Sequence, residues 1–127
     1  MAHKYIREYE IFLQEKASDN PNDFRTVEFV GCSNYREGVK EAKRLSARCP
    51  FEGSNGETIV NVELVCRQSE VDEFGDVWDS VEIFYDEFTD GKYVGRYKET
   101  ARGWDFVPVK KKARPVSRKA AKPAGPK

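Results

Sequence analysis

The sequence has one histidine and three cysteines, and neither residue type occurs in a catalytic or metal-binding pattern. His3 stands near the N-terminus, where chains fray, so Ser-His-Asp and Cys-His mechanisms lack a well-placed base. The cysteines lack the close C-x-x-C pair that is typical of zinc sites. We therefore expect no catalytic residue, no metal and no cofactor, and we interpret Cys32, Cys49 and Cys66 as small buried hydrophobic residues.

Long apolar runs are also missing from the sequence. No window approaches the roughly 18 consecutive apolar residues that a membrane-spanning helix needs. The first ten residues contain no apolar core of the kind found in a secretory signal peptide. These two absences predict a soluble, intracellular protein, placed in the cytoplasm, that has no membrane partner.

Acidic residues are absent from the C-terminal segment 110–127, although Asp plus Glu equal Lys plus Arg over the whole chain at 22 each. This segment holds eight of the 22 basic residues, so its formal charge is +8. Residues 1–109 hold the other 14 basic residues and all 22 acidic residues, so their formal charge is −8. The prolines of 110–127 prevent a continuous helix, and its few apolar side chains cannot offset the conformational entropy that ordering would cost. The sequence predicts an acidic domain, 1–109, and a disordered basic tail, 110–127.

One helix is predicted in the acidic domain. Asn34 is a suitable N-cap, Glu37 follows three residues later as in a capping box, and Pro50 forbids continuation. Alternating hydrophobicity predicts a strand pair before the helix and four strands after it. The predicted strands are 5–16, 24–32, 59–68, 77–85, 92–99 and 104–109. The fold class is therefore α+β, with one amphipathic helix on a mainly antiparallel sheet of five to six strands in the order ββαββββ.

Aromatic side chains are predicted on both faces of the strand at 77–85. Strict alternation places Tyr85 on one face and Trp78 and Phe84 on the other. A fold with one helix leaves a sheet face or edge partly uncovered, and large exposed apolar areas usually mark contacts. We expect a protein-interaction surface at Trp78, Phe84 and Phe88, and the alternative is that these rings are buried against the strand nearest the tail or against loops.

Basic and aromatic residues interleave over 91–104, as they do in many proteins that bind single-stranded nucleic acid. In a regular strand, however, Tyr93 and Tyr97 share one face while Arg96 and Lys98 share the other, which separates the rings from the charges. The RNA-recognition fold also requires a second helix, which the sequence does not predict. We therefore favour tyrosines facing the core over a stacking platform for bases.

Carboxylates are concentrated between Glu70 and Asp90. Converging carboxylates can hold Mg²⁺ for phosphoryl chemistry, and Asp79 with Asp76 is the first pair to consider. The spacing does not match a calcium loop, and no motif fixes a catalytic partner. A magnesium-dependent nuclease is therefore a third hypothesis for function, behind two non-enzymatic ones.

The function that the sequence indicates first is binding of nucleic acid or nucleoprotein by the tail, since a proline-spaced basic arm can follow a phosphate backbone and release counterions. The expected phosphate contacts are Lys110, Lys111, Lys112, Arg114, Arg118 and Lys119. A weaker second surface is expected on the helix at Arg36, Lys40 and Arg44, where the alternative is an ordinary solvated face. The alternative function is a protein-interaction or assembly accessory subunit, such as a viral one, that uses the aromatic sheet face.

Overall fold

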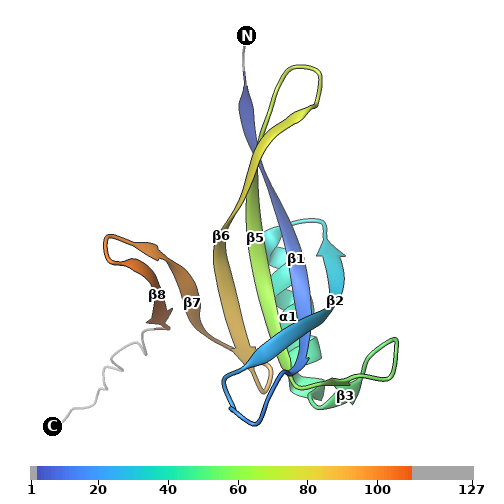
Figure 1. The fold of residues 1–127 in the computed structure, drawn as a ribbon. Helices are drawn as coiled ribbons and strands as arrows, with labels where there is room; N and C mark the ends of the chain where they lie inside the picture. Colours follow the sequence, from blue (N-terminus) through green and yellow to red (C-terminus); the bar gives the residue numbers. More distant parts are fainter. Residues whose placement is uncertain (1–2, 110–127) are drawn as a thin grey trace, which may run out of the picture.

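The computed structural model describes residues 3–109 as one helix packed on one face of a six-stranded antiparallel sheet (Figure 1). The helix is α1 (Tyr35–Arg48), and the sheet order is β2-β1-β5-β6-β7-β8. The strands are β1 (Lys4–Lys16), β2 (Phe24–Cys32), β5 (Asn61–Val71), β6 (Val77–Thr89), β7 (Lys92–Thr100) and β8 (Gly103–Pro108). The α+β fold predicted from the sequence is thereby confirmed, whereas the predicted basic tail lies outside the described residues.

Helix α1 begins and ends where the sequence predicts. The side chain of Asn34 accepts a hydrogen bond from the Glu37 N–H at 2.8 Å, which satisfies one of the free donors of the first turn. Cys49 caps the other end in an extended conformation, directly before Pro50. No helix within 3–109 combines the length and apolar character that crossing a membrane requires.

The core lies between α1 and the sheet face that α1 covers. Its fully buried members come from the helix, from the central strands and from the segment before β5. They are Ile11, Leu13, Ala42, Leu45, Ile59, Val62, Leu64 and Phe88. Each large apolar side chain that is removed from water here stabilises the fold by about 1.5–3 kcal/mol. The opposite sheet face, which no helix covers in the described residues, is called the open face below.

The segment after α1 differs from its prediction as a loop. It forms a short hairpin of β3 (Phe51–Glu52) and β4 (Thr58–Ile59). The Gly53 N–H donates to the Glu57 carbonyl at 2.7 Å, and the Ser54 hydroxyl donates to Glu28 of β2 at 2.6 Å. Strands of two residues are too short to produce a hydrophobic alternation, so the sequence carried no signal for this hairpin.

A β-bulge in β6 reverses the predicted faces of two aromatic rings. Phe84 pairs with Cys66 and Glu82 pairs with Arg67, which leaves Ile83 as an extra residue. Phe84 consequently packs on the helix side, with its ring centre 6.0 Å from that of Tyr35. Tyr85 consequently lies on the open face. The sequence-based assignment of these two rings was wrong because alternation assumes an uninterrupted ladder.

A second bulge, between β6 and β7, separates two tyrosines that alternation places together. Phe88 pairs with Tyr93 and Glu87 pairs with Gly95, so Val94 is the extra residue. Tyr93 packs against Phe88 in the core, whereas Tyr97 lies on the open face. A side chain at Gly95 would place its Cβ 2.7 Å from the Val107 carbonyl oxygen, so only glycine allows β8 to approach this closely.

A buried ion pair joins β6, β7 and α1 on the helix side. Asp86 is fully buried and accepts two hydrogen bonds from Arg96, at 2.7 and 3.1 Å, and one from the Tyr35 hydroxyl at 2.6 Å. The Arg96 guanidinium also lies 3.5 Å from the centre of the Phe84 ring. The hydrogen bond with Asp86 raises the pKa of Arg96 above its ordinary value of 12.5, so the guanidinium stays charged.

The strands β1, β5 and β6 extend beyond the helix as a narrow arm, made of residues 4–8, 67–71 and 77–82 and closed by the turn 72–76 (Figure 1). The Asp72 carboxylate accepts hydrogen bonds from the Phe74 and Asp76 N–H groups, at 2.9 and 3.0 Å, and from the Trp78 indole N–H at 2.8 Å. These bonds, led by the one from Trp78, lower the pKa of Asp72. The turn at the tip of the arm is therefore held in one conformation by a single side chain.

Replacing Arg96 is expected to destabilise the fold far more than replacing an exposed arginine. Arg96→Leu leaves the buried Asp86 carboxylate without its cation, a change that costs about 3–5 kcal/mol. Arg102→Leu is the matched control, because Arg102 is 84% exposed in its ion pair with Asp105 and surface pairs contribute at most about 1 kcal/mol. Urea denaturation of both variants measures the difference, and equal losses would contradict the role given to Asp86.

Candidate binding cleft on the open sheet face

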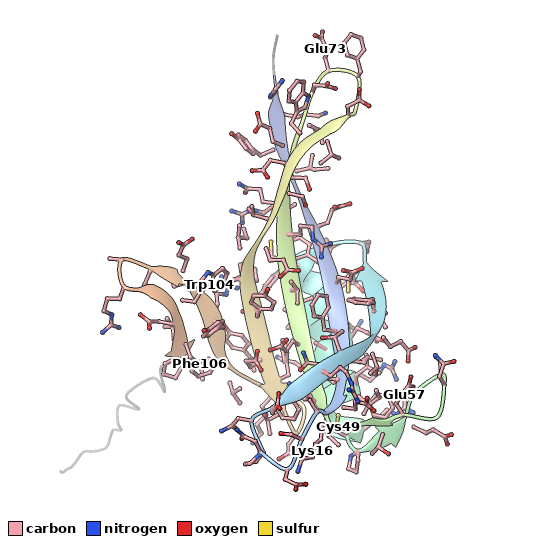
Figure 2. All side chains as sticks on the ribbon, in the orientation of Figure 1. Lys16, Cys49, Glu57, Glu73, Trp104 and Phe106 are labelled. Carbon is pink, nitrogen blue, oxygen red and sulfur yellow. The ribbon has the colours of Figure 1, made fainter. Side chains whose placement is uncertain are left out.

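A cleft of about 530 Å³ lies on the open face where the β7–β8 hairpin leaves β6. It is lined by Glu63, Val81, Glu82, Tyr85, Tyr97 and Trp104. Strand β7 pairs with β6 only between Phe84 and Thr89, so the hairpin diverges from the rest of β6 (Figure 1). Figure 2 labels Trp104 on this hairpin, to one side of β6. Strands β5 and β6 and the β7–β8 hairpin thus contribute to a single concave surface.

Three aromatic rings form one wall of the cleft. Tyr97 and Trp104 are stacked, with ring centres 5.6 Å apart and planes inclined by 27°. Tyr85 stands edge-on to Trp104 at 5.7 Å. Tyr97 and Trp104 remain about 40% exposed, so their faces are available to a ligand. Rings that hold each other in place lose little conformational freedom on binding, which favours recognition.

Carboxylates supply the charge of the cleft. Glu82 forms an ion pair with Arg67 at 3.3 Å and accepts a hydrogen bond from the Tyr85 hydroxyl. Glu63 accepts a hydrogen bond from the Gln14 amide at 3.0 Å and stands directly opposite Glu87 across β5 and β6. No ion pair between Lys or Arg and either Glu63 or Glu87 forms within the described part of the chain. The cleft therefore adjoins two neighbouring carboxyl groups without a compensating cation.

The proximity of these two carboxyl groups changes their acidity. Burial, followed by the hydrogen bond and the charge of Glu63, raises the pKa of Glu87 well above its ordinary value of 4.5. Like charges in direct opposition across a sheet are destabilising, and a shared proton removes the repulsion. A proton on Glu87 leaves Glu63 and Glu82 as the acidic groups of the cleft that a cation would meet.

The cleft combines aromatic faces with carboxylates, two kinds of group that interact with cations. The negative faces of aromatic rings attract ammonium and guanidinium groups, and adjacent carboxylates accept their hydrogen bonds. Burial raises the pKa of the Tyr85 phenol, so this group stays neutral. Within 3–109 no three His, Cys, Asp or Glu side chains are grouped to hold a metal ion.

The expected aromatic surface at Trp78, Phe84 and Phe88 does not form as one exposed patch. Trp78 is 63% exposed on the arm, whereas Phe84 and Phe88 are only 7% and 1% exposed. The bulge at Ile83 turns Phe84 towards the helix, and Phe88 belongs to the core beneath α1. Two of the three rings are therefore buried, but on the helix side and not against the last strand or loops as the alternative supposed.

The predicted basic residues fall into two groups. Arg36, Lys40 and Arg44 are exposed on α1, as expected, and Arg44 forms an ion pair with Glu41 at 2.5 Å. The predicted phosphate contacts in the tail lie outside the described residues. They are Lys110, Lys111, Lys112, Arg114, Arg118 and Lys119. The helix surface is thus accessible, although one of its three cations is already paired.

The predicted acidic cluster serves several local purposes. Asp86 forms the buried ion pair with Arg96, and Asp72 accepts the hydrogen bonds that stabilise the turn of the arm. The Asp79 carboxylate accepts a hydrogen bond from the adjacent Ser80 N–H at 3.0 Å. The Asp76 N–H donates to the Asp72 carboxylate, and the Asp76 carbonyl accepts from the Asp72 N–H, both at 3.0 Å. The nuclease hypothesis gains no support from this arrangement.

Sequence patterns identified only part of the cleft. Tyr97 and Trp104 stand in the basic-aromatic stretch, but their charged neighbours in space are glutamates from other strands. Glu63 and Tyr85 gave no signal, because the bulge and the pairing of β5 with β6 decide where they lie. The one local feature at this position is that Glu63 is the single charged residue of the otherwise apolar segment 62–66.

Comparison of this chain with protein-family models, curated proteins and solved structures finds no match. Its function is therefore inferred from the geometry and charge of the described residues. The cleft is the surface on which aromatic faces, uncompensated carboxyl groups and a concave shape coincide.

Glu87→Gln is expected to stabilise the protein increasingly as the pH rises above about 5. The folded state raises the pKa of Glu87, so it holds a proton that the unfolded chain releases, and wild-type stability falls with rising pH in this window. The neutral amide removes this dependence and gains about 1 kcal/mol or more near pH 8. Thermal unfolding between pH 5 and 8 tests this, with Asp19→Asn in the exposed β1–β2 loop as control. An unchanged pH dependence would contradict the interaction of the two carboxyl groups.

Proposed function

We propose that this protein is a non-enzymatic binding protein whose acidic domain captures a basic segment of another protein in the open-face cleft. The observation that carries the proposal is the carboxyl pair Glu63 and Glu87, which has a shared proton but no basic partner among the described residues, beside the stacked rings of Tyr97 and Trp104. A lysine or arginine side chain in the cleft would neutralise the pair and lie over an aromatic face.

The net charge of the domain supports the same kind of partner. Residues 1–109 carry 22 acidic and 14 basic side chains, so the domain attracts cationic segments from beyond contact distance. Electrostatic attraction of this kind accelerates association and weakens as salt is added. A phosphate backbone would instead meet Glu63 and Glu82 in the cleft, which argues against nucleic acid on this face.

The proposal is tested by titrating the full chain with a synthetic nine-residue peptide of alternating lysine and threonine. Trp104→Ala is expected to weaken binding at least tenfold, because it removes the stacked wall, and Glu63→Gln several-fold. Phe29→Ala is the matched control, since Phe29 is an exposed aromatic residue of the edge strand β2 that packs on Phe12 and does not line the cleft. Calorimetric affinities that are equal for Trp104→Ala and the wild type would overturn the proposal.

Binding of nucleic acid or nucleoprotein by the tail is the second proposed function. It is favoured by the separation of charge in the sequence, because all eight cations of 110–127 occur without an acid. The acidic domain repels polyanions over much of its surface, so the tail is the segment best suited to phosphate. The two functions are compatible, since they involve opposite charges on separate parts of the chain.

Neutralising six of the eight basic residues of the tail is expected to remove most of the salt-dependent part of nucleic-acid binding. The substitutions to glutamine are Lys110, Lys111, Lys112, Arg114, Arg118 and Lys119. Loss of up to six phosphate contacts reduces the slope of log affinity against log salt by as much as about 5. Fluorescence anisotropy with duplex DNA and single-stranded RNA measures this, with Arg36→Gln/Lys40→Gln/Arg44→Gln testing the helix surface. Binding unaffected by the tail substitutions would exclude the tail as the phosphate contact.

A further inference from the structure

The strand β6 has one free edge directly beside the cleft. It pairs with β5 along nearly its full length, from Val77 to Phe88, but with β7 only from Phe84 to Thr89. Within the described residues, the segment 77–82 therefore has a strand neighbour on one side only. An exposed strand edge presents backbone N–H and C=O groups to which an extended peptide can pair.

The free edge leads into the cleft. Val81 and Glu82 belong both to the unpaired segment of β6 and to the lining of the cleft. A peptide that pairs with 77–82 would lie about 4.8 Å from β6 and continue towards the rings of Tyr97 and Trp104. The β7–β8 hairpin already occupies the position of the next strand farther along β6. The added strand would thus end where the aromatic wall begins.

The side chains along the edge specify the chemistry of the partner. Val77, Trp78 and Val81 are each about half exposed or more, while Asp76, Asp79 and Glu82 provide negative charge along the same stretch. Residues 70–79 contain no Lys or Arg, so the edge lacks the lysines that commonly prevent strand pairing. A complementary strand carries lysine or arginine alternating with small or β-branched residues. A second copy of this edge would bring carboxylates together and is disfavoured.

Asp79 has a particular place in this edge. Its carboxylate accepts a hydrogen bond from the Ser80 N–H at 3.0 Å, so this backbone donor of β6 is bonded to the Asp79 side chain. Asp79 is exposed, and its carboxylate can turn from this N–H to a cationic side chain of an incoming strand. In that exchange the Ser80 N–H gains a backbone carbonyl partner and the carboxylate gains a charge partner.

We infer that the basic segment binds by β-strand addition to β6 at 77–82, with one cationic side chain entering the cleft between Glu63 and Trp104. This inference rests on the proposed function, since it names how the same cleft recognises its partner. Backbone hydrogen bonds would provide affinity, and alternate side chains would provide selectivity for positive charge.

The test uses three forms of the lysine-threonine peptide with the full-length protein: unmodified, N-methylated at every lysine, and N-methylated at every threonine. In an added strand, alternate N–H groups face the protein, so only one methylated form should lose affinity, by at least tenfold, while the other stays within about threefold. Methylation leaves all the charges in place. Equal affinities for the three forms, or equal losses for both methylated forms, would overturn strand addition while leaving capture of a basic segment intact.

Hydrogen exchange provides the second readout. When the unmodified peptide is bound at saturation, exchange of the Ser80 amide is expected to slow at least tenfold, while amides of the opposite edge strand β2 keep their rates. An unchanged Ser80 rate would overturn strand addition. If the unmodified peptide fails to bind at low salt, the proposed function of the cleft is itself overturned.

Discussion

The buried ion pair between Asp86 and Arg96 is the interaction on which the arrangement of the sheet depends. A carboxylate at this depth is tolerated because Arg96 and the hydroxyls of Tyr35 and Tyr93 satisfy it. The pair fixes β7 against β6 from the helix side. Since Tyr97 follows Arg96 in the strand, holding the arginine beneath α1 directs Tyr97 to the open face. The core interaction therefore positions the aromatic wall of the cleft.

Acidic side chains have different partners on the two faces of the sheet. On the helix side, Asp86 receives a full set of partners and stabilises one arrangement of α1, β6 and β7. On the open face, Glu63 and Glu87 face each other without a cation. The first arrangement is complete in itself, whereas the second is relieved by a proton or by a ligand of positive charge. This contrast is why we propose the open face, rather than the better-satisfied helix side, as the binding surface.

Local signals in the sequence were sufficient for the fold. Asn34, Glu37 and Pro50 define the helix, because capping and proline act within a few residues. The Asp90–Gly91 turn was equally readable, and both residues have positive φ angles, 53° and 80°, as a tight hairpin requires.

The cleft depends on features that alternation cannot predict. The bulge at Ile83 exchanges the faces of Phe84 and Tyr85, and the bulge at Val94 separates Tyr93 from Tyr97. Each extra residue alters the direction of the side chains beyond it without leaving a clear pattern in the sequence. The opposition of Glu63 and Glu87 likewise follows from register between strands, which no local pattern specifies.

The measurement that tests the central claim most directly is a map of amide and indole chemical-shift changes in the ¹⁵N-labelled full chain as the lysine-threonine peptide is added. The account predicts that the largest changes occur at Glu63, Tyr85, Tyr97 and the Trp104 indole N–H. Changes concentrated on α1, with the cleft resonances unmoved, would contradict it.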